Sequence, residues 1–291
     1  MSEMRYEAPK TVAGAVGLLL QADGGGRVLA GGTDLLVQMR AWRVKPGVLV
    51  DVKNIPGMRS IVTEGGRFRV GAAVTGMELM EHAGFAKTWP GVVDGVKLIG
   101  SVQVKGRATI GGNVCNASPA ADSVPALMAA GAVVRIEGAQ GKRECALEEF
   151  MVGPGKTALK AGEIVHSFVL PKRAPRSGDA YLRFTPRTEM DIAVVGAGVN
   201  LTLDDAGMCT AARVSLGAVA ERALLVREAG EALLGTRVDE EALKRLAAAA
   251  SAACRPIDDK RGTKAFRIQV AGVMARRAAE MALARARGGK R

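Results

Sequence analysis

Ala30-Gly31-Gly32-Thr33-Asp34-Leu35-Leu36 joins a short buried strand, predicted at residues 28–30, to a stretch with helical spacing that extends to residue 42. Glycines at such a junction let the backbone approach a ligand closely, and the N–H groups that begin the next helix face the same point. A phosphate or pyrophosphate fits this arrangement. A tight turn capped by Thr33 or Asp34 would use the same residues, so this stretch alone leaves both interpretations open.

A second loop, rich in glycine, hydroxyl and amide groups, extends from Thr109 to Asp122 and has the sequence TIGGNVCNASPAAD. Asp122 or Ser123 is expected to cap the helix that follows, with Pro125 in its first turn. A loop of this length inside a domain usually lines a ligand. Two Gly-Gly loops with such neighbours suit a dinucleotide, whose phosphates need many donors and whose sugars need polar partners.

The segments around the two loops predict an α+β protein. Residues 1–57 have the pattern of a small α/β unit, and residues 60–73 that of a hairpin that turns at Gly65-Gly66. Three successive strands from Tyr181 onward predict an antiparallel sheet, and helical patterns follow it to Arg287. The segment 171–178, with two prolines, is the predicted linker, so the division between two regions is expected near residue 177.

The composition predicts a folded protein rather than a disordered chain, because hydrophobic residues make up 48% and charged residues 24%. No apolar run reaches the ~18 residues that a membrane span needs. The N-terminal sequence MSEMRYEAPK has no apolar signal core, so a cytoplasmic location is expected. The 4 cysteines lie far apart and there are 2 histidines, which argues against a zinc site, an iron–sulfur cluster and a disulfide framework.

The net charge of +12 suggests nucleic acid as a partner, but the excess is concentrated after Arg255 and aromatic residues make up only 3%. Few stacking platforms for bases are therefore available. A solvated face or a docking surface for an acidic partner explains such a tail better. No catalytic residue is predicted: His82 is expected on a helix surface and His166 in a strand, and no metal ligands are expected.

The chain resembles the FAD-binding medium subunit of molybdenum hydroxylases, the family of aerobic-type carbon monoxide dehydrogenase and xanthine dehydrogenase. The resemblance is carried by VLAGGTDLLVQMR (Val28–Arg40), ATIGGNVCNASPAADSVPALMA (Ala108–Ala129) and YLRFTPRTEMDIAVVGAGVNL (Tyr181–Leu201). It implies a vanillyl-alcohol-oxidase-type (PCMH-type) FAD-binding domain at residues 1–176, with subdomains at about 1–57 and 58–176. It also implies a C-terminal domain at 177–291 with a three-stranded antiparallel sheet and helices.

The resemblance also implies which residues would bind FAD. Backbone donors from the two loops would hold the pyrophosphate, polar side chains would bind phosphate, ribityl or ribose oxygens, and other residues would lie near the isoalloxazine, as would the loop 185–191. The residues implied for these three roles are, in that order, Val28, Leu29, Ala30, Gly31, Gly32, Thr33, Asp34, Leu35, Leu36, Ile110, Gly111, Gly112 and Asn113; Thr109, Asn113, Asn116 and Asp122; and Ile99, Gly100, Ser101, Val165 and Arg183.

The function implied by the resemblance is electron transfer through FAD within a larger complex. An iron–sulfur small subunit and a molybdopterin large subunit would be the partners, in a dimer of heterotrimers, with NAD or a quinone as electron acceptor. Two alternatives stay open. A self-sufficient FAD-dependent oxidoreductase of the same fold would need its own catalytic base, and a basic nucleic-acid-binding protein would show binding with a steep salt dependence.

Overall fold

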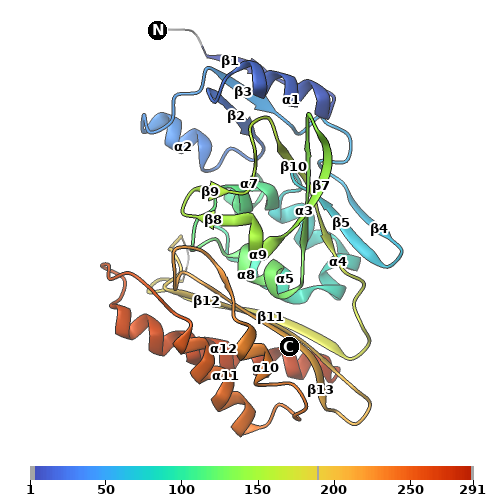
Figure 1. The fold of residues 1–291 in the computed structure, drawn as a ribbon, viewed down its shortest axis with the longest axis vertical. Helices are drawn as coiled ribbons and strands as arrows, with labels where there is room; N and C mark the ends of the chain where they lie inside the picture. Colours follow the sequence, from blue (N-terminus) through green and yellow to red (C-terminus); the bar gives the residue numbers. More distant parts are fainter. Residues whose placement is uncertain (1–3, 189, 290–291) are drawn as a thin grey trace.

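The computed structural model describes residues 4–188 and 190–289, and its elements form three units stacked along the longest axis of the molecule (Figure 1). Helices and strands alternate irregularly along the chain, and the α+β class predicted from the sequence is confirmed. The first unit stands at the N-terminal end of the stack. The third unit, at the other end, contains the long C-terminal helix.

The first unit is a three-stranded parallel sheet in the order β1-β3-β2. The central strand, β3, is buried along its whole length, and all of its residues except Asp51 are apolar. The first glycine loop follows β2 directly, so it lies at the carboxyl end of a parallel strand, where ligands commonly bind. The elements are β1 (Arg5–Glu7), α1 (Val12–Gln21), β2 (Gly26–Leu29), α2 (Leu35–Arg40) and β3 (Val48–Asp51).

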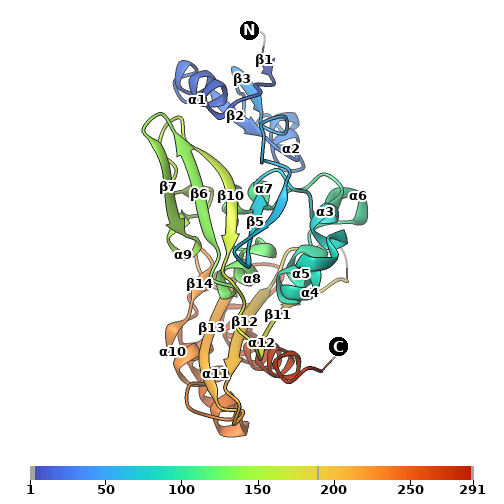
Figure 2. The same cartoon turned by 90° about the vertical axis from the view of Figure 1, so that its right-hand side faces the viewer.

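The second unit is a five-stranded antiparallel sheet in the order β4-β5-β10-β6-β7, with helices packed beside it (Figure 2). The predicted hairpin is confirmed, and Gly65 and Gly66 both have positive φ in its turn. The elements are β4 (Ile61–Glu64), β5 (Arg67–Gly71), α3 (Gly76–Glu81), α4 (Ala83–Thr88), α5 (Pro90–Lys97), α6 (Val102–Lys105), α7 (Ile110–Cys115), α8 (Ser123–Ala129), β6 (Val133–Gly138), β7 (Gly141–Ala146), α9 (Leu147–Phe150), β8 (Met151–Gly153), β9 (Lys156–Thr157) and β10 (Ile164–Leu170).

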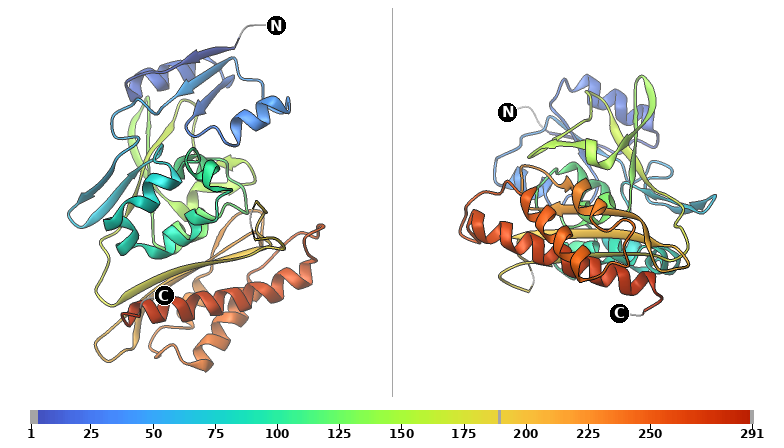
Figure 3. Two further views of the ribbon diagram at one scale, coloured as in Figure 1. Left: turned by 180° about the vertical axis from the view of Figure 1, so that it is seen from behind. Right: turned by 60° about the horizontal axis from the view of Figure 1, so that its bottom comes forward.

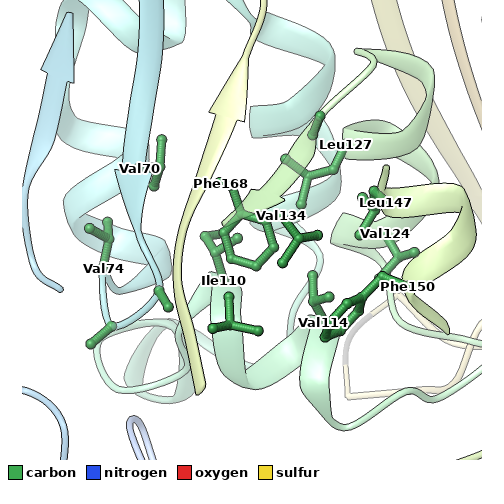
Figure 4. Packing of buried hydrophobic residues seen from close by; sticks show 14 of the residues in the cluster. Val70, Val74, Ile110, Val114, Val124, Leu127, Val134, Leu147, Phe150 and Phe168 are labelled. Carbon is green, nitrogen blue, oxygen red and sulfur yellow. The ribbon is translucent and has the colours of Figure 1, made fainter. Parts of the chain in front are cut away.

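One hydrophobic cluster fills the space between this sheet and its helices (Figure 4). Phe168 and Val134 belong to strands, and Ile110 and Val114 contribute from α7. Residues four apart lie on the same side of a helix, so these two residues anchor one face of α7 in the core. The intervening Gly112 and Asn113 are thereby left on the opposite face, and the loop predicted at Thr109–Asp122 is helical in this part.

The third unit is a four-stranded antiparallel sheet, β11-β12-β13-β14, enclosed between two layers of helices (Figure 3). Helices α5 and α8 of the second unit cover one face and α12 covers the other. The three long strands agree with the prediction, and β14 adds a two-residue edge strand. The elements are β11 (Ser177–Phe184), β12 (Val195–Leu203), β13 (Cys209–Gly217), β14 (Leu224–Leu225), α10 (Arg227–Glu231), α11 (Glu240–Ala252) and α12 (Lys264–Ala286).

The predicted linker at residues 171–178 is shorter in the structure, because β11 already begins at Ser177. The segment is also tied to the units beside it. Arg173 donates a hydrogen bond of 2.7 Å to the buried carboxylate of Asp179, and its guanidinium lies 4.8 Å from the ring centroid of Trp89. A second side chain, Arg285 of α12, pairs with Asp94 of α5 at 2.6 Å and connects the same two units.

The basic C-terminal segment is part of the core of the third unit. Several alanines of α12 are fully buried against the sheet and α11. Several of its cations pair within the chain, among them Arg267 with Asp259 at 2.7 Å and Arg276 with Glu240 at 2.8 Å. One side of the helix is thus part of the core, and Arg277 remains exposed on its outer side, where the solvated face or docking surface expected from the charge stays a prediction.

Candidate functional site

A cavity of about 630 Å³ lies where the two glycine loops meet. This volume is within the range of about 300–1,000 Å³ that is typical of small-molecule sites. Most of the site residues predicted from the sequence line it, although they come from distant parts of the chain. These residues are Val28, Ala30, Gly31, Gly32, Thr33, Asp34, Leu35, Ile99, Gly100, Thr109, Gly111, Gly112, Asn113, Asn116, Asp122 and Val165.

Five of the predicted site residues do not line the cavity: Leu29, Leu36, Ser101, Ile110 and Arg183. Ile110 is fully buried in the core, and the Ser101 hydroxyl accepts a hydrogen bond from the Val104 N–H as the N-cap of α6. Leu29 and Leu36 pack around Gly32. These four residues shape the wall from behind.

The first glycine loop offers a row of backbone donors. The N–H groups of Gly31, Gly32, Thr33 and Asp34 donate no hydrogen bond to any acceptor in residues 4–188 and 190–289. All four residues line the cavity, and Gly32 has φ of 77°, a conformation that favours glycine. Consecutive unpaired N–H groups in a turn before a helix form a site that suits phosphate oxygens.

The second glycine loop differs, because its N–H groups are already bonded within the chain. The N–H of Gly111 donates to the Ala72 carbonyl at 2.9 Å, that of Gly112 to the Thr109 hydroxyl at 3.0 Å, and that of Asn113 to the Thr109 carbonyl at 3.0 Å. The prediction that Gly111–Asn113 supply backbone donors to a pyrophosphate therefore needs correction. Thr109 is the N-cap of α7, and its hydroxyl and carbonyl oxygens accept the hydrogen bonds of the Gly112 and Asn113 N–H groups.

The glycines of the two loops are required for different contacts. A Cβ atom on Gly31 would lie 2.1 Å from the Arg107 carbonyl oxygen, and one on Gly111 would lie 2.5 Å from the Ala72 carbonyl oxygen. Both glycines therefore allow backbone segments to pack against each other. A Cβ atom on Gly112 would meet only the Thr109 hydroxyl, at 2.9 Å, and Gly112 is part of the cavity wall. Its missing side chain leaves space for a ligand.

Asp122 and Arg183 form a buried ion pair at the edge of the cavity. The guanidinium Nη1 of Arg183 donates to the Asp122 carboxylate at 2.7 Å and to the Leu98 carbonyl at 3.0 Å, and the Tyr181 hydroxyl donates to the same carboxylate at 3.0 Å. Burial raises the pKa of Asp122 to about 6, against the opposite effect of Arg183 and Tyr181. Arg183 thus lies behind Asp122, and its charge is paired.

The cavity wall contains carboxylates but no lysine, arginine or histidine among the residues that the structure describes. A bound polyphosphate would therefore rely on N–H groups rather than on side-chain cations. Hydrogen bonds from Arg143 lower the pKa of Glu163, and the N–H of Ile192 with two arginines lowers that of Asp191 to about 2. With Asp122 paired to Arg183, three of the lining carboxylates are already engaged.

Residues that the sequence analysis did not select also line the cavity. Gln38 is one helical turn from Leu35, and its side-chain amide donates to Asn116 at 3.4 Å, connecting α2 to the second loop. The periodicity of α2 could have identified it. Of the loop 185–191, Met190 and Asp191 reach the wall, whereas Glu189 lies outside the described residues. The other lining residues are Val52, Ala72, Val104, Ala108, Cys115, Ser118, Ala120, Ala121, Leu159, Glu163, Ile164 and Ile192.

The two histidines take structural positions. His82 is the N-cap of α4, where Nδ1 accepts from the Phe85 N–H at 3.0 Å, and Nε2 of His166 lies 3.3 Å from the Pro56 carbonyl oxygen. The residues described include no cluster of histidine, cysteine, aspartate or glutamate that could hold a metal ion. In the same part of the chain, no helix combines the length and apolar character needed to cross a membrane.

Comparison with known proteins gives matches over nearly the whole chain. Residues 2–173 match the model of the FAD binding domain in molybdopterin dehydrogenase, and residues 180–282 match the CO dehydrogenase flavoprotein C-terminal domain. The carbon monoxide dehydrogenase medium chain of Afipia carboxidovorans is 36% identical over 97% of both chains. The nicotinate dehydrogenase FAD-subunit of Eubacterium barkeri is 31% identical over 84% of both.

Solved structures agree with these sequence matches. A chain of the Cu,Mo-CO dehydrogenase in its cyanide-inactivated form superposes with a TM-score of 0.93 and 34% identity, covering 97% of this chain and 98% of that one. A chain of quinoline 2-oxidoreductase from Pseudomonas putida 86 superposes with a TM-score of 0.89 and 30% identity, covering 98% of each. The similarity therefore extends across all three units.

Proposed function

Because the chain belongs to the family of FAD-binding medium subunits of molybdenum hydroxylases and is an FAD-binding oxidoreductase subunit, we propose that it is the electron-transfer subunit of such a complex. It would hold FAD in the cavity between the two glycine loops and connect an iron–sulfur partner with an electron acceptor such as NAD or a quinone. The cofactor would supply the exchange of one or two electrons, and the chain supplies its position and surroundings.

The observation that carries this proposal is the row of unpaired N–H groups at Gly31–Asp34. A pyrophosphate brings several acceptor oxygens and two negative charges, and these four donors would bind them without a side-chain cation. The donors lie where β2 ends and α2 begins, so the helix adds the positive end of its dipole. The residues of this loop therefore fit the cofactor that the family carries.

The second loop would contribute shape and side-chain groups. Gly112 would leave room for the cofactor, because no side chain fills the space next to it. Asn113 uses its carbonyl oxygen to accept from Ser123 at 2.6 Å, which leaves its NH₂ group as a donor toward the cavity. Asn116 is bonded to Gln38 in the same way and would offer the same group. The Thr109 hydroxyl would still donate its hydrogen.

The alternative of a self-sufficient FAD-dependent oxidoreductase has less support. Such an enzyme needs an acid or base poised beside its substrate. Three lining carboxylates, Asp122, Glu163 and Asp191, are paired with arginines, and neither histidine lines the cavity among the residues described. We therefore assign the substrate chemistry to a molybdopterin subunit. The organization as a dimer of heterotrimers, the domain boundary at residues 176/177 and the cytoplasmic location remain predictions.

The proposal is tested by the response of the flavin in the isolated, FAD-loaded chain. Under anaerobic conditions a chemical reductant should bleach the flavin absorbance and an added acceptor should restore it. Purines, N-heterocycles and carbon monoxide should leave the spectrum unchanged over the same period, because three of the four carboxylates that line the cavity are paired with arginines and, among the residues described, only Asp34 is not. Rapid bleaching by any of these substrates would favour the self-sufficient oxidoreductase instead.

A further inference from the structure

Helix α2 forms a thin wall with two different faces. Leu35 and Gln38 line the cavity on its inner side. Leu36, Val37 and Arg40 lie on the other side, as expected from 100° of rotation per residue, and they are exposed. Leu36 is 47% exposed and Val37 64%. No residue of this helix is buried, although most of them are apolar. The outer face is therefore apolar and uncovered.

Trp42 follows just beyond the end of the helix. Its side chain is 71% exposed, and its φ of 58° places it in the left-handed region, which is unfavourable for a bulky residue. The Lys45 ammonium group lies over the indole, 5.2 Å from the ring centroid. A strained and exposed tryptophan brings no stability to the isolated chain, and tryptophan is enriched at the anchoring points of interfaces.

Cations surround this apolar face. Arg40, Arg43 and Lys45 are exposed, and none of them forms an ion pair with a carboxylate in the described part of the chain. On α12, by comparison, three of the four arginines, Arg267, Arg276 and Arg285, pair with carboxylates of the same chain. A partner that covers α2 would therefore present apolar side chains at its centre and carboxylates at its edge.

We propose that the outer face of α2 with Trp42, the α2 surface (Leu36, Val37, Arg40, Trp42, Arg43 and Lys45), is the docking surface for the protein partner that exchanges electrons with the cofactor in the cavity. The partner is a folded subunit with an apolar patch ringed by carboxylates. The inference rests on the proposed electron-transfer function and deepens it by locating where the partner binds. One helix, about 10 Å thick, separates a protein on this face from the cavity, so docking here brings a redox centre close to the cofactor site.

The test compares two variants of the α2 surface with one control. Val37→Glu places a charge in the apolar centre, and Trp42→Asn removes the indole while supplying a residue that tolerates positive φ. Neither residue lines the cavity among the residues described, so both variants should keep their FAD content and thermal stability. Val273→Glu makes the same change at another exposed valine, 43% exposed against 64% for Val37, on the outer side of α12. Each chain is produced with the iron–sulfur and molybdopterin subunits. Size-exclusion chromatography shows whether the complex forms, and titration of each chain with the partner subunits measures the affinity.

We expect both α2 variants to bind the partner subunits at least about tenfold more weakly, as for loss of an interface anchor, with Val273→Glu unchanged. Full assembly of both variants would overturn the inference while leaving the electron-transfer function intact. Loss of assembly only in Val273→Glu would place the interface on α12 instead and also overturn it. A wild-type chain that forms dimers alone through Trp42 would show that a second copy covers this face. A wild-type chain that binds neither subunit would contradict the proposed function and the inference together.

Discussion

Replacement of Gly112 by valine is expected to lower the affinity for FAD at least about 100-fold and to leave the fold intact. The new side chain would project into the cavity, because Gly112 lies on the face of α7 opposite the buried Ile110 and Val114. Within the protein its Cβ atom would meet only the Thr109 hydroxyl. Loss of that N-cap costs about 1 kcal/mol, which a folded domain tolerates. Flavin content after purification and far-ultraviolet circular dichroism give the two readouts.

Gly17→Val is the matched control, because it also places a β-branched residue within a helix but meets no atom within 4 Å. This variant should retain FAD at the wild-type ratio. Gly31 and Gly111 are unsuitable for the same test, since a Cβ atom on either would collide with backbone oxygen and disturb the fold. A folded Gly112→Val protein with a full complement of FAD would show that the cofactor does not occupy the space beside this glycine.

Replacement of Asp179 by alanine is expected to lower the free energy of unfolding by about 3–5 kcal/mol, the usual cost of removing one partner from a buried ion pair. The Asp179 carboxylate accepts from Arg173 at 2.7 Å and from the Gly91 N–H at 2.9 Å, and the residue is 2% exposed. Without it, the Arg173 guanidinium loses its counter-ion and keeps only the Thr88 carbonyl as acceptor, and the Gly91 N–H loses its acceptor. Urea unfolding of the apoprotein measures the change.

Arg276→Ala provides the comparison for this experiment. Arg276 pairs with Glu240 and Glu280 on the exposed side of the C-terminal helices, and surface pairs contribute about 1 kcal/mol or less. Its removal should change the midpoint of unfolding only slightly. If Asp179→Ala is no more destabilising than Arg276→Ala, the contact between the units depends on apolar packing rather than on this ion pair.

Local signals in the sequence predicted the elements that depend on a few neighbouring residues. Gly65-Gly66 between alternating residues predicted the hairpin. The two glycine loops were likewise visible, because turns before helices have characteristic residues. Their meeting around one cavity followed from the resemblance to a family rather than from any local pattern.

The features that could not be predicted from the sequence depend on contacts between residues far apart in the chain. Strand β1 is formed by Arg5-Tyr6-Glu7, which have no strand pattern and are held by pairing with β3. The Gly111 N–H is taken by Ala72, nearly 40 residues earlier, so the donor capacity of the second loop could not be judged from its composition. The position of Arg183 behind Asp122 could likewise not be judged from the sequence, because it depends on how β11 packs against α8.

The absorbance spectrum of the purified chain, with the released flavin identified by chromatography, tests the central claim most directly. The four unpaired donors of the first loop and a cavity wall to which both loops contribute are suited to a dinucleotide. We predict a flavin spectrum and one FAD per chain, lost on replacement of Gly112 by valine. A folded chain that takes up no flavin when incubated with FAD, or that retains only the mononucleotide FMN, would contradict the account.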